Sequence, residues 1–206
     1  MPRDFAGYLA DIAAAGPTNH IAAMVGHNTL RAYANGMDER LRPGALEQMC
    51  RLADEAFAAG AVGLSSGLIY PPGSYGDTAE LVALARVAHR WNRPYTTHLR
   101  NEDDRLAEAL DEAIAIATQA RVRLQVSHCK VAGKANHGGG KALLAKLHAA
   151  RLAGVDVRGD QYPYRAGGTF LNALLPGAAL VGGTEAMRAR LADPAERRGC
   201  APWPRT

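Results

Sequence analysis

The sequence has few cysteines and no long apolar run, and both absences narrow what the protein can be. Its three cysteines, Cys50, Cys129 and Cys200, are widely spaced and form no Cys-x-x-Cys pair, which predicts reduced thiols and a cytoplasmic protein. No stretch of about 18 apolar residues occurs, so we expect no transmembrane helix. The first residues include an acid and no apolar segment, which does not match a secretory signal. At 206 residues, we expect one domain with a substantial core.

Lysine is scarce as well. Lysine and arginine together number 24, but the lysines are confined to one stretch, at positions 130, 134, 141 and 146. The arginines are spread along the chain without a dense basic cluster, so the net charge of +4 does not predict nucleic-acid binding. Because an ammonium and a guanidinium are not equivalent at close-packed sites, Lys130 is a candidate for contacting an anionic substrate group. The alternative is a surface lysine without such a role.

Strand-like and helix-like segments alternate along the chain. We predict strands at 20–25, 61–68, 94–98, 124–128 and 155–160, and helices at 43–59, from 77 onward, at 102–120, 141–153 and 184–191. The strands start about 30 to 40 residues apart, as repeated βα units around a parallel sheet require. About five such units are too few for a closed eight-stranded barrel, so the sequence predicts an α/β domain at 1–194 that is either doubly wound or part of a (β/α)8 TIM barrel. Residues 195–206 show no periodicity, and we expect an irregular, disordered tail there.

Two of the predicted strands end in a histidine where the chain turns toward a helix. They are PYTTH, ending at His98, and LQVSH, ending at His128. The ends of consecutive parallel strands are neighbours in a barrel, so both imidazoles can converge on one metal ion. Zinc suits imidazole nitrogen, and a catalytic zinc site usually has three protein ligands and a water. Asp160, at the end of the fifth strand, is a further candidate as a ligand, as a partner of a ligand, or as a cap.

Two tyrosines and two glycine-containing segments complete the candidate site and its alternatives. Tyr70 and Tyr162 follow the second and fifth strands beside prolines; they can bind a carboxylate and form an apolar wall, or simply pack within loops.

Residues 63–67 match G-x-S-x-G, but the serine lies inside a predicted strand with no helix after it, which argues against a serine hydrolase. The segment 133–140 lacks the residues of a phosphate loop and is better explained as a mobile loop over the site.

Five stretches of the sequence carry a family resemblance and run in the family's order. They are MVGHNTLR (24–31), GAVGLSSGLIYPP (60–72), THLRNE (97–102), SHCKVAGKAN (127–136) and DQYPYRAGGT (160–169). Together they resemble the D-aminoacylases, the N-acyl-D-amino-acid deacylases of the amidohydrolase superfamily. The resemblance implies a zinc-dependent (β/α)8 barrel that hydrolyses the linear amide bond of a small-molecule N-acyl-D-amino acid. It also implies that His98 and His128 are metal ligands and that Lys130, Tyr70 and Tyr162 contact the substrate.

The sequence departs from the family pattern at several positions. It contains no His-x-His, and the family's ligating cysteine has no counterpart, because Cys50 falls within a predicted helix. No lysine precedes Lys130, so a carbamylated bridging lysine has no candidate, and Gly168 stands where the family often has serine. The general base is expected outside these residues. We therefore expect a central portion of a deacylase barrel that is inactive or nearly so.

Two other functions are compatible with the same residues. One is a non-catalytic remnant or interaction module with a degenerate metal site, and the other is a different amidohydrolase reaction, such as cyclic-amide or dipeptide hydrolysis. A partial barrel would also leave strand edges unpaired, which predicts self-association through those edges. No membrane partner is expected.

Overall fold

A five-stranded parallel sheet lies at the centre of the computed structural model, which describes residues 4–164 and 166–199. The strands are β1 (Val25–Gly26), β2 (Leu64–Gly67), β3 (Tyr95–His98), β4 (Leu124–Val126) and β5 (Val157–Gly159). They are hydrogen-bonded in the order β1-β2-β3-β4-β5, and every pairing is parallel. The predicted βα units are therefore confirmed.

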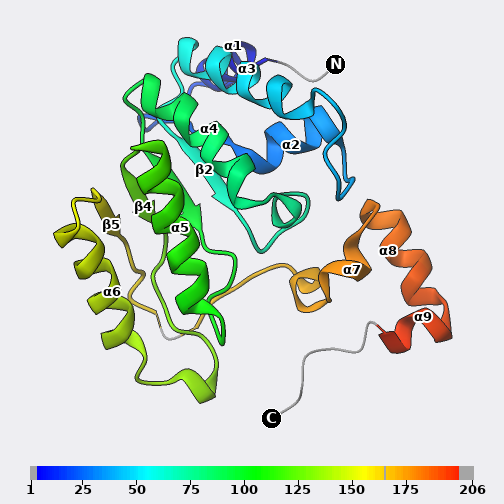
Figure 1. The fold of residues 1–206 in the computed structure, drawn as a ribbon. Coiled ribbons are helices and arrows are strands. Elements are labelled where there is room, and N and C mark those ends of the chain that lie inside the picture. The colour runs from blue at the N-terminus through cyan, green and yellow to red at the C-terminus, as the bar shows by residue number, and fades with distance from the viewer. Residues whose placement is uncertain (1–3, 165, 200–206) are drawn as a thin grey trace.

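Helices connect each strand to the next. They are α2 (His27–Asn35) and α3 (Ala45–Ala58) after β1, α4 (Thr78–Arg90) after β2, α5 (Leu106–Ala120) after β3, and α6 (Gly140–Leu152) after β4. Because the strand order never reverses and such crossovers are right-handed, the connecting helices fall on one face of the sheet. Figure 1 shows α4 and α5 in front of the strands. This arrangement is an arc of a barrel and excludes the doubly wound alternative.

The two faces of the sheet differ in polarity. One row of paired residues, buried at 0 to 2% exposure, faces the helices: Leu64, Tyr95, Leu124 and Val157. The adjacent row points to the opposite face and is polar and partly exposed: Ser65, Thr96, Gln125 and Arg158. His98 lies two residues after Thr96 and therefore shares this polar face. The core thus lies on the helix side, and the chemistry-bearing side chains emerge on the other.

Helix α5 illustrates how the sequence specifies the outer layer. The predicted apolar positions Leu106, Ala109, Leu110, Ala113 and Ile116 recur at three- and four-residue spacing, and all are buried. Each large apolar side chain buried in this way contributes about 1.5–3 kcal/mol. The helix ends at Arg121, whose φ of 55° is left-handed.

Several boundaries differ from the predictions. The first strand is only Val25–Gly26 instead of 20–25, because pairing with β2 begins at Val25. The structure adds α1 (Phe5–Ala14), α2 and α7 (Gly177–Leu180), which the sequence analysis did not predict. Near the C-terminus, α8 spans Gly183–Ala192. None of the described helices is long and apolar enough to cross a membrane.

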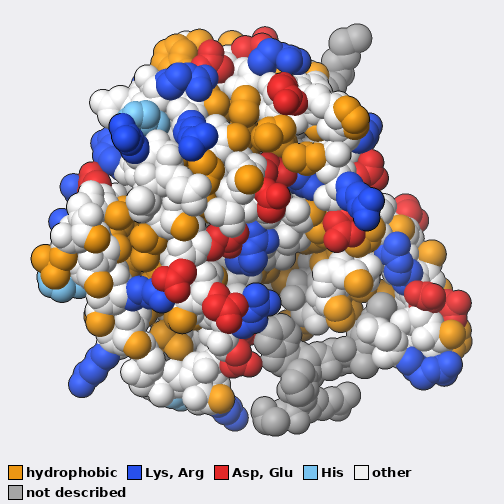
Figure 2. All heavy atoms as spheres, in the orientation of Figure 1, with side chains coloured by type: hydrophobic (Ala, Val, Ile, Leu, Met, Phe, Trp, Pro, Cys, Tyr) orange, Lys and Arg blue, Asp and Glu red, His pale blue; other side chains and the backbone are white. Residues whose placement is uncertain are grey.

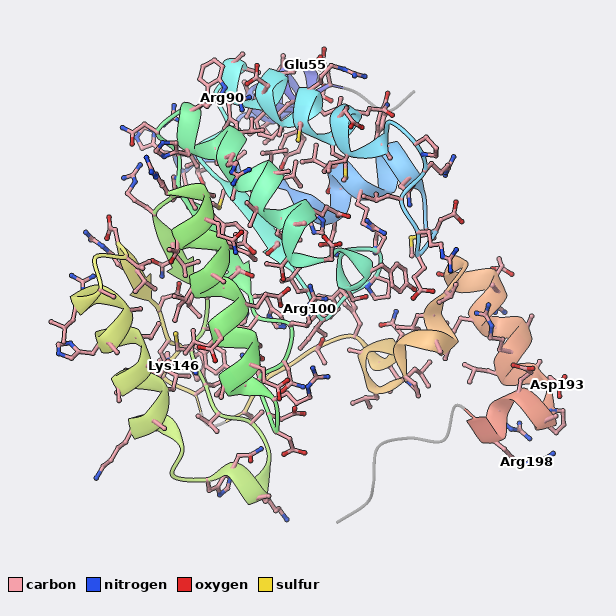
Figure 3. All side chains as sticks on the ribbon, in the orientation of Figure 1. Glu55, Arg90, Arg100, Lys146, Asp193 and Arg198 are labelled. Carbon is pink, nitrogen blue, oxygen red and sulfur yellow. The ribbon has the colours of Figure 1, made fainter. Side chains whose placement is uncertain are left out.

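The predicted irregular tail needs a correction in its first part. Residues 195–199 belong to a helix, α9 (Pro194–Gly199), which follows α8 directly. Asp193 explains this start, because its carboxylate accepts a hydrogen bond from the backbone N–H of Ala195 at 2.7 Å, and proline is favoured at the first helical position. Figure 3 labels Asp193 at the bend between the two helices. Residues 200–206 and Cys200 lie outside the described residues.

Candidate metal centre

The two strand-tip histidines lie side by side at the C-terminal ends of β3 and β4. Their ring centroids are 4.5 Å apart, and His98 Nδ1 lies 2.7 Å from His128 Nε2. His98 is the last residue of β3, and His128 follows β4 by two residues. The structure therefore brings together the two side chains that the strand-tip reasoning selected, while their role as metal ligands stays a prediction.

A glutamate completes the cluster, and the sequence analysis missed its role. Glu102 Oε1 lies 3.0 Å from His128 Nδ1 and 3.9 Å from His98 Nδ1. Three possible donor atoms lie within 4.8 Å of one another, one each from His98, Glu102 and His128. Glu102 lies four residues after His98, in the loop that follows β3, and this spacing from a histidine was the available signal. Two imidazoles and a carboxylate form a donor set that suits zinc.

Lys130 contacts the same carboxylate. Its Nζ lies 2.6 Å from Glu102 Oε2 and 2.9 Å from His128 Nδ1, and it sits 5.7 Å from the ring centroid of Tyr162. The Lys130 side chain is 27% exposed, so solvent or an anionic ligand can reach it. The scarce lysine is therefore part of the cluster and not an isolated surface residue.

The two predicted tyrosines flank the histidines. The ring centroid of Tyr70 is 5.3 Å from that of His98, and the ring centroid of Tyr162 is 6.4 Å from that of His128. The Tyr70 hydroxyl also shares a hydrogen bond of 2.7 Å with Thr169 Oγ1. All five side chains selected from the sequence thus meet at one rim of the sheet.

Asp160 supports the backbone of His128. Its Oδ1 accepts a hydrogen bond from the His128 backbone N–H at 2.6 Å, and its Oδ2 accepts one from Gln125 Nε2 at 2.6 Å. His128 has a left-handed φ of 40°, which is uncommon for a residue with a side chain and is concentrated at functional sites. Of the roles considered for Asp160, the observed contacts match that of a partner of a candidate ligand.

Burial sets the protonation of His98. Removal from solvent lowers the pKa of His98, Glu102 opposes this shift, and His128 and Lys130 add to the lowering. A neutral imidazole is the form that binds a metal ion. His98 Nε2 is buried without a hydrogen-bond partner among the described residues. A partly buried, neutral imidazole fits a metal-binding role.

A second charged cluster, also missed from the sequence, lies beneath the loop that carries Tyr70. Glu80 of α4 is 3% exposed; its Oε1 lies 2.6 Å from His27 Nε2, and its Oε2 lies 2.5 Å from an Arg31 guanidinium nitrogen. Next to His27, Asn28 donates a hydrogen bond from Nδ2 to the carbonyl of Tyr70 at 3.0 Å. The buried charges therefore join α2 to α4, and Asn28 joins α2 to the loop that presents Tyr70.

Arg100 holds the other end of that loop. Its guanidinium donates to the carbonyls of Ser74 and Gly76 at 2.8 and 2.7 Å and makes a two-point contact with the Glu112 carboxylate at 2.8 and 2.9 Å. Figure 3 labels Arg100 near the middle of the molecule, close to helix α5. A planar guanidinium suits such paired contacts, which tie the β2–α4 loop to α5.

The serine-hydrolase alternative finds no matching geometry among the described residues. Ser65 lies within β2, and Ser66 Oγ is hydrogen-bonded to Tyr95 and Thr97 at 2.8 Å each, so no strand-turn-helix elbow presents a serine. On the face drawn in Figure 2, acidic and basic side chains are interspersed over the described residues. A surface hollow of about 280 Å³ lies at the opposite end of the sheet, beside Val122 and Val155.

Comparisons with known proteins identify relatives, although no family model matches the sequence. The N-acyl-D-glutamate deacylase of Alcaligenes xylosoxydans xylosoxydans is 42% identical over 170 residues, which cover 82% of this chain and 35% of that protein. The D-aminoacylase of the same organism is 37% identical over 183 residues, covering 86% of this chain and 37% of that protein. The chain belongs to the D-aminoacylase family. It spans about a third of the length of these relatives.

Solved members of the D-aminoacylase family share the fold. A crystal structure of D-aminoacylase, described as defining a novel subset of amidohydrolases, superposes with a TM-score of 0.76 at 39% identity, over 80% of this chain and 35% of that one. The N-acyl-D-glutamate deacylase from Bordetella bronchiseptica, solved with zinc and a phosphonate inhibitor, gives 0.74 at 39% identity, over 78% and 34%. The prediction of a partial amidohydrolase barrel is therefore confirmed.

Proposed function

We propose that this chain contributes the zinc-binding and substrate-binding rim of a hydrolase that deacylates N-acyl-D-amino acids. The observation that carries the proposal is the 2.7 Å approach of His98 Nδ1 to His128 Nε2, beside Glu102 and Lys130. Relatives named as deacylases of N-acyl-D-glutamate and N-acyl-D-aspartate, and one solved with zinc and a phosphonate that mimics the tetrahedral intermediate, support it.

His98 and His128 would hold the zinc. The chemistry that zinc supplies when bound is polarisation of an amide carbonyl and activation of water near neutral pH. Lys130 would bind the carboxylate of the substrate, because it is the partly exposed cation of the cluster. Tyr70 and Tyr162 would form the walls that orient the acylated amino acid between them.

The proton transfers need a general base that the described cluster does not offer. Both of its carboxylates are engaged: Glu102 contacts Lys130 and His128, and Asp160 accepts from the His128 backbone and from Gln125. We therefore expect these 206 residues to bind zinc and substrate but to release little free D-amino acid by themselves.

Calorimetry of the zinc-loaded chain with N-acetyl-D-glutamate and N-acetyl-L-glutamate tests the substrate class. We expect the D enantiomer to bind more tightly, and Lys130→Ala to weaken its binding about 10- to 100-fold, as loss of a charged hydrogen bond does. Lys134→Ala, which removes an exposed lysine of the same loop region, is the control and should leave binding unchanged.

Three results would count against the proposal. Equal binding of the two enantiomers, or equal effects of the two lysine substitutions, would remove the deacylase assignment. Failure of the chain to bind any zinc would favour the non-catalytic remnant. Rapid release of D-glutamate would contradict the expectation that the general base lies outside this chain.

A further inference from the structure

The loop after β3 holds Glu102 firmly at the metal centre. Asn101 Oδ1 accepts hydrogen bonds from the backbone N–H groups of Asp103 and Arg105 at 3.0 and 2.9 Å, which turns the chain after residue 101. The carbonyl of Glu102 accepts from the N–H of Ala132 at 2.7 Å, which ties it to the loop after β4. With 11% of its side chain exposed, Glu102 is a fixed charge and not a mobile surface acid.

We infer that Glu102 is the positioning residue of the metal centre: its carboxylate keeps His128 in the tautomer whose Nε2 is free for zinc and holds Lys130 beside that zinc. The inference rests on one part of the proposed function, namely that His98 and His128 are the zinc ligands. It adds a role that neither the strand-tip pattern nor the family resemblance assigned.

The two nitrogens of His128 face different partners. Nε2 lies 2.7 Å from His98 Nδ1, whereas Nδ1 lies 3.0 Å from Glu102 Oε1. A neutral imidazole carries one N–H, so a metal on Nε2 requires the proton on Nδ1, the nitrogen 3.0 Å from the Glu102 carboxylate. Metal-binding histidines commonly donate this second N–H to a carboxylate, which fixes the tautomer and raises the basicity of the ligating nitrogen.

Lys130 competes for the same nitrogen. Its Nζ lies 2.9 Å from His128 Nδ1 and, as an ammonium, can only donate. When Nδ1 accepts from Lys130, the proton sits on Nε2, which then donates to His98 instead of binding a metal. Glu102 opposes this state in two ways, because it attracts the Nδ1 proton through Oε1 and the ammonium through Oε2 at 2.6 Å. Loss of its negative charge therefore favours the tautomer that cannot bind zinc.

Zinc titration of the chelator-treated chain by calorimetry tests the inference. We expect Glu102→Gln to weaken zinc binding about 10- to 100-fold, the range typical for partners of metal ligands. Glu102→Asp keeps the charge and should recover part of the loss. Glu108→Gln makes the same change at an exposed glutamate of α5 and should leave the zinc affinity unchanged. Thermal unfolding of the metal-free variants checks that each folds as the parent does.

Two spectroscopic readouts separate positioning from direct ligation. In the Co²⁺-loaded chain, Glu102→Gln should leave the shape of the visible absorption band unchanged, since the ligands are the same. In the zinc-loaded chain, the hydrogen-bonded Nδ1 proton of His128 should resonate far downfield, and Glu102→Gln should move it upfield.

Three other results would refute either the positioning role of Glu102 or the proposed function. Unchanged zinc affinity in Glu102→Gln would overturn the positioning role and leave the proposed function intact. A greater loss with an altered cobalt band would make Glu102 a direct ligand. A zinc-binding chain that responds to Glu102→Gln as expected but does not distinguish D from L substrates would uphold this inference and refute the proposed function.

Discussion

Replacing Glu80 with glutamine removes one negative charge from a cluster in which every member is buried. Glu80 is 3% exposed, and its partners His27 and Arg31 are both 0% exposed. Glutamine keeps the shape of the side chain and one acceptor oxygen. The substitution therefore measures the charge and not the packing.

The expected cost follows from what the change leaves behind. Arg31 remains ionised, and the acceptors that surround its guanidinium are then all uncharged: the carbonyls of Asp38 and Glu39, at 3.4 and 2.6 Å, and an amide oxygen in place of the carboxylate. Removing one partner of a buried ion pair typically costs about 3–5 kcal/mol, because the other charge is left uncompensated. Domains are stable by about 5–15 kcal/mol, so Glu80→Gln should leave the fold marginal.

Urea unfolding followed by circular dichroism measures the loss. Glu55→Gln makes the same change on the exposed side of α3, where Figure 3 labels Glu55, and should alter the unfolding free energy by less than about 0.5 kcal/mol. The combined variant Arg31→Met with Glu80→Leu removes both charges. It should be less destabilised than the sum of its single substitutions, because no unpaired charge is left.

Two results would refute this account of the cluster. A loss below about 1 kcal/mol in Glu80→Gln would mean that the pair contributes no more than an exposed one. Strict additivity of the two apolar substitutions would mean that Arg31 and Glu80 do not interact energetically.

Further predictions concern pH, the site's support, a helix end and assembly. Burial raises the pKa of Tyr95 from 10.0 to about 12, so its hydroxyl stays protonated to a higher pH in the folded chain than in the unfolded chain. The unfolding free energy should therefore fall by about 2 kcal/mol as pH rises from 10 to 12, and Tyr95→Phe should flatten that fall in urea titrations. Asp160→Ala should weaken zinc binding about 10- to 100-fold in calorimetry, unlike Asp156→Ala at an exposed position. Arg121→Gly should increase the unfolding free energy by about 0.5–1 kcal/mol and so raise the thermal midpoint, because glycine adopts a left-handed φ without strain. Sedimentation should show self-association of the chain through its strand edges, and a stable monomer would contradict this.

The sequence predicted the strand tips because two local signals agree there. An apolar run ends in a histidine and polar residues follow at once, in both 94–98 and 124–128. Helices α3, α4 and α5 followed from the spacing of their apolar residues, as the buried face of α5 shows. In both cases the information lies within a few residues of the chain.

Helix α2 could not be predicted from the same signals. Its buried residues include His27, Arg31 and Asn35, which any hydropathy pattern assigns to the surface. His27 and Arg31 are buried against Glu80, which lies 53 residues after His27 in the chain. Glu102 was missed for a similar reason, since its contacts with His128 and Lys130 form only after folding.

The left-handed backbone of His128 explains why a second carboxylate is needed at this site. A left-handed residue with a side chain costs roughly 1–2 kcal/mol, and His128 adopts this conformation with a φ of 40°. A hydrogen bond to a charged acceptor contributes about 1.5–3 kcal/mol, and the His128 N–H donates one to Asp160 at 2.6 Å. The second contribution offsets the first, so Asp160 stabilises the backbone turn while Glu102 orients the ring. Because the two carboxylates act on different parts of the same residue, removing Asp160 should lower both stability and zinc affinity. Removing the charge of Glu102 should chiefly lower zinc affinity.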